Sequence, residues 1–136
     1  MVPPLGAMTG TSVSRPIENL DPCYMIQREF LEADSPARIL RSLYTVNKSQ
    51  SKKVSLTYIC RRAGIPSKGY LAFVMSGKRK LNMKYWGAIC QTFKLEGVYE
   101  HILKTHLQLE VSECAESRRL LLSQLSTLKQ KLIETV

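Results

Sequence analysis

The stretch Ser55–Asn82, with the sequence SLTYICRRAGIPSKGYLAFVMSGKRKLN, contains two short helical patterns separated by a tight turn. Ser55 and Ser67 are suited to helix N-caps, because a serine oxygen accepts hydrogen bonds from the free amides of a first turn. Gly64 favours the left-handed conformation that ends a helix, and Pro66 cannot continue one. Two helices joined by a short turn that contains glycine are typical of a helix-turn-helix unit. In such units the second helix enters the DNA major groove.

The segments before and after this stretch repeat hydrophobic residues at the three- and four-residue spacing of helices. We expect one helix over Asp21–Leu31 and further helices that begin near Pro36, Asn82 and Val98. The following hydrophobic residues are expected on their inward faces: Tyr24, Met25, Phe30, Leu31, Leu40, Leu43, Met83, Trp86, Ile89, Phe93, Ile102 and Leu107. Few segments alternate with a period of two, so no sheet is expected.

These patterns predict an all-α fold, a compact bundle of about five helices that contains the helix-turn-helix, plus a C-terminal leucine-rich helix. Residues 1–20 are rich in Pro, Gly, Ser and Thr and are expected to form a disordered tail. Residues 21–110 are expected to form the helix-turn-helix domain, with the bundle over 36–110. Residues 111–136 are expected to form the C-terminal helix.

The C-terminal helix has two interpretations. Ser112 is expected to cap it, and four leucines follow at intervals of four, three and four residues: Leu121, Leu125, Leu128 and Leu132. These intervals are those of a coiled-coil seam, which favours self-association into a dimer. Leu120 and Leu122 widen the hydrophobic face, which favours packing of the helix on its own domain. Both interpretations stay open at the level of sequence.

The basic residues are concentrated in one interval. The chain carries a net charge of +9, yet no acidic residue occurs between Asp34 and Glu96, where 13 Lys and Arg residues lie. The rest of the chain has 7 basic and 11 acidic residues. Solvated surfaces normally mix both signs of charge, so this interval indicates a polyanionic partner such as DNA or RNA. A basic face that serves only solubility is the alternative.

The expected DNA contacts follow from this charge and from the position of each residue in the helix-turn-helix. Cations neutralise phosphates and position a protein on DNA, the start of a helix favours an anion, and a glycine permits close approach of the backbone. The expected contacts are Ser67, Lys68, Gly69, Ala72 and Ser76 on the second helix, Lys78, Arg79 and Lys80 in the next loop, and Lys52, Lys53, Arg61 and Arg62 on the other side. Tyr70 and Phe73 are expected on the other flank of the helix, in the core or beside it.

The second helix contains no Arg, Asn or Gln, which are the residues that bind bases through two hydrogen bonds. Recognition of sequence is therefore expected to be weak or to depend on the basic loop.

Other classes of protein find little support. Cysteines occur at four widely spaced positions without a CxxC pair, which argues against zinc and favours reduced thiols in a cytosolic protein, with Cys60 and Cys90 in the core. No apolar run is long enough to span a membrane, and no Lys or Arg precedes Arg15 as a secretory signal requires. His101 and His106 cannot share a helical face, and no catalytic arrangement appears. We expect no enzyme, no cofactor and no bound metal.

The segment Gly64–Asn82 resembles the motif G-hydrophobic-x-S-x-x-Y-L-S-x-hydrophobic-hydrophobic-x-G-K-R-x-L-S of a family of poorly characterised bacterial helix-turn-helix-like proteins, abundant in predatory bacteria. Gln27–Leu31 resembles the Y-R-x-F-L element of that family, and the likeness covers residues 24–110. The segment is more distantly similar to the Cro/C1-type (xenobiotic response element) domains. Ala72 departs from the usual serine. The resemblance implies DNA binding and a role in transcription.

Two functions are therefore expected in order of preference. The first is a cytoplasmic bacterial transcriptional regulator that binds duplex DNA through residues 55–80 and dimerises through residues 112–136. The alternative is a protein-interaction module, in which a degenerate helix-turn-helix docks an acidic partner. An antitoxin-like repressor, with one end for DNA and one for a protein, would combine the two.

Overall fold

The computed structural model of the chain describes residues 22–134, so the expected N-terminal tail and a cap at Asp21 lie outside the described residues. The described part is all-helical, as predicted, and contains no strand. Its elements are α1 (Pro22–Glu32), α2 (Pro36–Gln50), α3 (Leu56–Ala63), α4 (Lys68–Met75), the 3₁₀ turn η2 (Met83–Tyr85), α5 (Trp86–Thr92), α6 (Val98–Val111) and α7 (Ala115–Glu134).

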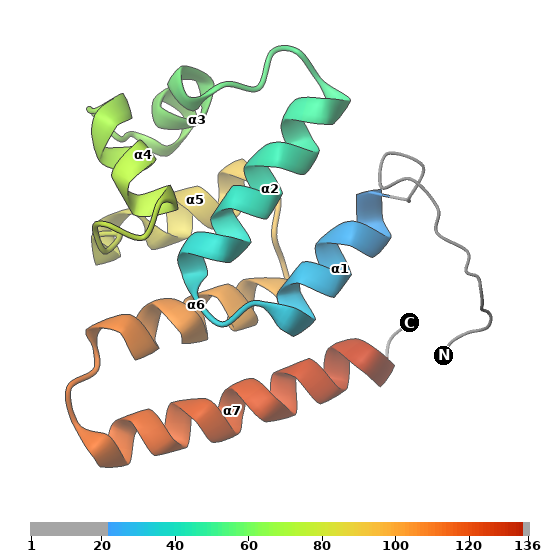
Figure 1. The fold of residues 1–136 in the computed structure, drawn as a ribbon, viewed down its shortest axis with the longest axis vertical. Helices are drawn as coiled ribbons and strands as arrows, with labels where there is room; N and C mark the ends of the chain where they lie inside the picture. Colours follow the sequence, from blue (N-terminus) through green and yellow to red (C-terminus); the bar gives the residue numbers. More distant parts are fainter. Residues whose placement is uncertain (1–21, 135–136) are drawn as a thin grey trace.

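The predicted bundle of five helices corresponds to α2–α6, with α1 and α7 added to it. Figure 1 shows α3 and α4 at one end of the molecule and α7 along the opposite side, with α6 between α7 and the other helices. Helix α1 lies beside α2, and α7 packs on α6 and also contacts α1. The helix-turn-helix is therefore far from the C-terminal helix.

Serine caps set the starts of three helices. The Oγ atoms of Ser35, Ser55 and Ser67 accept hydrogen bonds from the third backbone amide that follows each of them, at 3.3, 3.1 and 3.1 Å. A cap of this kind contributes about 1 kcal/mol to a helix. It matters most for α3 and α4, because each has only eight residues and needs external support.

The core joins all of these helices. Its largest fully buried side chains come from six of them: Phe30, Ile39, Leu40, Leu43, Ile59, Leu71, Ile89, Ile102, Leu103 and Leu107. Phe30 of α1 packs edge-on against the ring of Tyr99 of α6, with the ring centres 5.0 Å apart. Cys60 and Cys90 are buried, as predicted. Burial raises the pKa of both thiols, to about 11 for Cys90.

Three expectations about local structure were wrong. Met83 is 66 % exposed rather than inward, because it lies in a 3₁₀ turn and α5 begins only at Trp86, which shifts the helical phase. Tyr24 is 50 % exposed on α1. Ser112 ends α6 instead of capping α7, and the first turn of α7 forms when the carbonyl of Cys114 accepts a bond from the amide of Arg118 at 3.0 Å.

Candidate nucleic-acid interface

The turn between α3 and α4 is held by its own backbone and by one buried side chain. Gly64 has a φ of 76°, the left-handed conformation predicted for it. The amides of Gly64 and Ile65 both donate to the carbonyl of Cys60, the second at 2.9 Å. The side chain of Ile65 is buried in the core. The turn therefore sets the orientation of α4 relative to α3 without contributions from surface residues.

Helix α4 is fixed at its C-terminal end by α2. The guanidinium of Arg41 donates to the carbonyl of Met75 at 2.8 Å. A cation at this position satisfies a free carbonyl and interacts favourably with the helix dipole. The inward residues Leu71, Val74 and Met75 are buried. Both ends of α4 are thus anchored, and its outer face is left to solvent.

The basic loop after α4 (residues 78–80) is also held by backbone hydrogen bonds. Gly77 turns the chain with a φ of 83°, and the amides of Lys78 and Arg79 donate to the carbonyl of Phe73 at 2.9 and 3.3 Å. The hydroxyl of Tyr70 donates to the carbonyl of Lys80 at 3.2 Å and accepts from the amide of Asn82 at 2.8 Å.

Leu81, directly after the basic loop, is buried, and its carbonyl accepts a bond from the indole of Trp86 at 3.0 Å. The loop is therefore fixed on both sides while its three cationic side chains are exposed.

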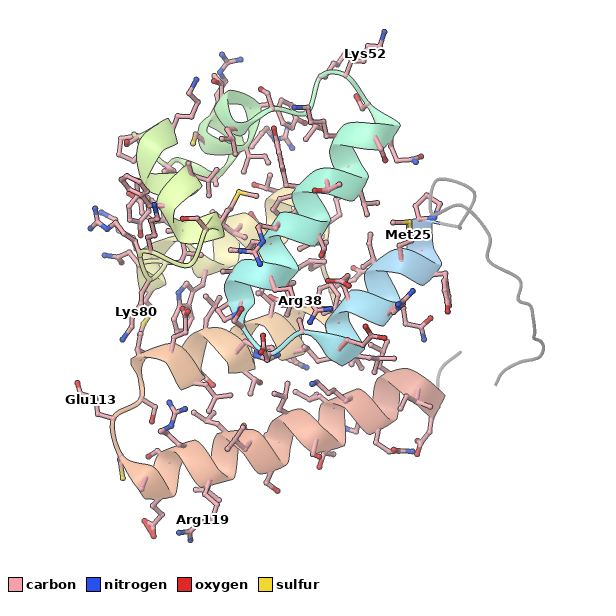
Figure 2. The ribbon with its side chains drawn as sticks, in the orientation of Figure 1. Met25, Arg38, Lys52, Lys80, Glu113 and Arg119 are labelled. Carbon is pink, nitrogen blue, oxygen red and sulfur yellow. The ribbon has the colours of Figure 1, made fainter. Side chains whose placement is uncertain are left out.

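The predicted DNA contacts lie on one half of the molecule, but not at one point. Lys78, Arg79 and Lys80 lie beyond the C-terminal end of α4, whereas Lys52 and Lys53 lie in the turn before α3. Figure 2 shows Lys52 and Lys80 far apart on the half of the molecule that carries α3 and α4. Arg61 and Arg62 are exposed on α3 between these two groups. The cations thus extend from the turn before α3, over α3, to the loop after α4.

Apart from Lys68 and Phe73, the outer face of α4 carries small side chains. Lys68, Gly69 and Ser76 are exposed, and Ala72 is half-buried. The hydroxyl oxygen of Ser67 already accepts a bond from the amide of Tyr70 as the helix cap, and the hydroxyl of Ser76 donates to the carbonyl of Phe73 at 3.0 Å. A Cβ atom on Gly69 would meet only the Ser67 oxygen, at an ordinary 3.7 Å. Nothing inside the protein therefore requires a glycine at this position.

The charges on this surface are not neutralised by acidic side chains. Within residues 22–134 the salt bridges involve Arg28, Arg38 and Lys104, and none of the predicted DNA contacts. Two cations of the acid-free interval have internal roles: Arg41 caps α4, and Arg38 forms a salt bridge with Glu29 at 3.0 Å. The hydrogen bonds from Arg38 lower the pKa of Glu29.

One acidic residue lies close enough to the basic loop to interact with it. Burial raises the pKa of Glu110 on α6, and the nearby charge of Lys80 acts in the opposite direction. Glu110 is half-buried and forms no salt bridge within the described residues. It therefore neutralises the surface only weakly.

Aromatic rings alternate with the cations. Arg79 lies over the ring of Tyr70 at 5.0 Å, Lys84 over Tyr85 at 5.2 Å, Arg62 over Tyr58 at 5.9 Å, and Lys78 over Phe73 at 5.9 Å. Such contacts restrain long side chains by about 0.5–1 kcal/mol each at exposed sites. The cationic heads are thus held near this surface.

Sequence reasoning missed Phe73 and Lys84. Phe73 is 48 % exposed on the outer face of α4, although it was expected in the core or beside it. Its spacing of four residues from Gly69 and three from Ser76 would have placed it on the same face. Tyr70, by contrast, is half-buried and contacts the core.

The four leucines of the predicted dimer seam face the chain's own core. Leu125 and Leu132 are buried, and Leu121 and Leu128 are half-buried against the same cluster. Arg118 also joins the two helices, because its guanidinium donates to the carbonyl of Leu109 at 2.6 Å. In this structure these leucines pack α7 on its own domain, which is the intramolecular alternative, and dimerisation through them stays a prediction.

Other sites find no support in the part of the chain that the structure describes. No group of three His, Cys, Asp or Glu side chains there could hold a metal ion. No helix among residues 22–134 is long and apolar enough to cross a membrane. Comparison of the chain with models of protein families, with curated proteins and with solved structures found no match.

Proposed function

We propose that the chain binds duplex DNA as a transcriptional regulator, with α4 in the major groove. The observation that carries the proposal is the exposed outer face of α4, which the basic loop follows directly, on a surface whose cations form no salt bridge within residues 22–134. A major groove is about 12 Å wide and admits one helix with its side chains. Beside Phe73, the small residues on the outer face of α4 would let the helix approach the bases closely.

The flanking cations would contact the phosphates on both sides of the groove. Lys78, Arg79 and Lys80 would bind one strand, and Lys52 and Lys53 the other. Phosphate contacts release counterions, so affinity is expected to fall steeply with salt, with a slope of about −0.9 for each phosphate neutralised. The backbone of the basic loop is already ordered by hydrogen bonds. Binding would therefore cost little further conformational entropy of the main chain.

The test is fluorescence anisotropy of a labelled random duplex of about 30 base pairs, titrated with protein at about 50 mM and about 200 mM salt. The double variant Lys78→Glu/Arg79→Glu is expected to bind more than about tenfold more weakly, because it loses two phosphate contacts and adds repulsion. Its circular dichroism spectrum should stay helical.

The matched control is Arg119→Glu/Lys131→Glu, which changes the charge equally on α7 at the opposite side of the molecule (Figure 2). It is expected to bind nearly as the unmodified chain does. Equal loss of affinity in both variants would mean that binding depends on the net charge of the protein and not on the basic loop. Unchanged affinity in the loop variant would overturn the proposal.

A protein-interaction module that docks an acidic partner is the second candidate. It is favoured by the outer face of α4, which offers no Arg, Asn or Gln to the bases. Absence of DNA binding at low salt, together with binding to an acidic protein that Lys78→Glu/Arg79→Glu abolishes, would select it.

Three further expectations stay predictions: the cytoplasmic location, the relation to Cro/C1-type domains and the homodimer. A homodimer through the four leucines of α7 would have to replace part of their packing on the chain's own core. Sedimentation velocity over a range of protein concentrations measures the oligomeric state directly.

A further inference from the structure

The outer face of α4 presents one large hydrophobic side chain. Phe73 is 48 % exposed and is the only large exposed hydrophobic residue of α3 and α4. Its neighbours on that face are Gly69, Ala72 and Ser76, none of which covers it. The ring therefore protrudes beyond the small side chains around it.

Apart from Lys68 at the start of the helix, this face offers almost no hydrogen-bonding group to a base. Gly69 and Ala72 have no polar side-chain atoms, and the hydroxyl of Ser76 already donates to the carbonyl of Phe73 at 3.0 Å. Side-chain hydrogen bonds at the centre of the interface would therefore distinguish poorly between the four base pairs. The remaining means of discrimination in a major groove is apolar contact, and thymine alone presents an apolar group there, its 5-methyl group.

We propose that Phe73 contacts thymine methyl groups in the major groove and gives the protein a preference for sites that contain thymine. This inference rests on the proposed binding of duplex DNA. Charge complementarity supports it, because the Lys78 ammonium lies 5.9 Å from the centre of the Phe73 ring. A phosphate bound by Lys78 would thus bring a base edge near the ring.

Gly69 supports the same geometry. It lies one turn before Phe73 on the same face, and the protein itself would accept a larger residue there, since the nearest atom to an added Cβ is at 3.7 Å. Its missing side chain leaves space beside the ring. That space would accept the sugar and base next to the contacted thymine.

The experiment separates the methyl group from every other property of the site. A duplex selected from a random library by the full chain is synthesised in two forms, with thymine or with uracil, which lacks only the 5-methyl group. The chain is expected to bind the uracil form about fourfold more weakly for each methyl group it buries, from the transfer free energy of one methylene. Phe73→Ala should bind both forms equally.

Leu120→Ala is the matched control, because it removes a similarly exposed hydrophobic side chain from α7. It should keep the full difference between thymine and uracil. Circular dichroism and urea unfolding establish that Phe73→Ala is folded, which its exposed position favours.

The outcomes distinguish this inference from the function on which it rests. Salt-sensitive duplex binding with equal affinity for both forms would overturn the role of Phe73 and leave DNA binding intact. A methyl dependence that persists in Phe73→Ala would do the same. Tighter binding to the separated single strands would assign the ring to base stacking instead. No binding to any DNA would remove both proposals.

Discussion

The hydroxyl of Tyr70 on α4 accepts a hydrogen bond from the amide of Asn82 at 2.8 Å. The same hydroxyl donates to the carbonyl of Lys80 at 3.2 Å, so one side chain of the helix holds both ends of the loop segment that follows Arg79. The aromatic ring of Tyr70 also lies under the guanidinium of Arg79. The helix expected in the groove and the loop expected on the phosphates are therefore fixed to each other.

Tyr70→Phe should loosen the basic loop while every charge remains. Loss of two partly exposed hydrogen bonds is expected to lower the free energy of unfolding by about 1 kcal/mol, as measured by urea denaturation. Affinity for duplex DNA should fall several-fold, because the loop must be ordered again on binding. Tyr85→Phe is the control, because it removes a hydroxyl from the neighbouring ring and leaves both hydrogen bonds of Tyr70 in place. Identical affinities for the two variants would contradict this role.

Gly69→Ala should separate stability from binding. Alanine is the better helix former, and the position accepts a Cβ, so the free energy of unfolding should rise by up to about 1 kcal/mol. DNA affinity should nevertheless fall, because the added methyl group occupies the space that the DNA would enter. Gly87→Ala is the matched control, because Gly87 is the second residue of α5 as Gly69 is of α4. An added Cβ at Gly87 would have no atom within 4 Å. It should stabilise similarly and bind DNA normally; equal binding by both variants would argue against close approach at Gly69.

Leu125→Ala tests the packing of α7. A buried leucine leaves a cavity when truncated, so the free energy of unfolding should fall by about 2–4 kcal/mol. Leu120→Ala, which removes an exposed leucine of the same helix, should change it by less than about 0.5 kcal/mol. Sedimentation velocity should give the same oligomeric state for both. A stability of Leu125→Ala that equals that of the unmodified chain would mean that α7 does not rest on the core.

His106 should make the protein less stable in mild acid. It is 3 % exposed on α6, and its Nε2 atom has no hydrogen-bond partner among the described residues. Burial lowers its pKa from 6.5 to about 4, with a further contribution from the charge of Lys129 and an opposing one from Asp34. The unfolded chain therefore takes up a proton first as the pH falls. The stability is complete above about pH 6.5 and is lost progressively towards pH 4, by up to about 3 kcal/mol.

The measurement is urea unfolding between about pH 7 and pH 4 for the unmodified chain and His106→Leu. The variant should show a flatter dependence over this range, because its apolar side chain does not titrate. Glu110 acts in the opposite direction, since its raised pKa favours the native state in acid, and it is common to both chains. The exposed His101 provides the control: His101→Gln should keep the slope of the unmodified chain. Parallel curves for the unmodified chain and His106→Leu would contradict the role of His106.

Local features of this fold could be predicted from the sequence. Serine caps, the left-handed Gly64 and the helical spacing each depend on a few neighbouring residues. Prediction failed where a short 3₁₀ turn shifted the phase, which moved Met83 to the surface. It also left open the side on which α7 would bury its leucines, because the same spacing suits a dimer seam and an intramolecular contact.

The charged residues of the candidate site could be predicted from the sequence, but the contacts that hold its helices in place could not. The acid-free interval is visible in the sequence, but Arg38 forms a salt bridge with Glu29 from α1, outside that interval. Arg41 caps α4 from a position 34 residues away, which no local pattern indicates. Phe73 was expected on the other flank of the helix, in the core or beside it. Its exposure depends on where α2 and α3 pack against α4, which is a property of the whole bundle.

The way the basic loop is fastened has a consequence for how this surface can change. Residues 78–80 are held by the carbonyl of Phe73, by the hydroxyl of Tyr70 and by the buried Leu81 that follows. In both sets of hydrogen bonds the loop contributes only its backbone atoms. Their own side chains add only exposed contacts with aromatic rings. Almost any residue could therefore stand at these three positions without loss of the fold. New binding preferences could arise there by single substitutions, in evolution or in a laboratory library, on a scaffold that stays constant.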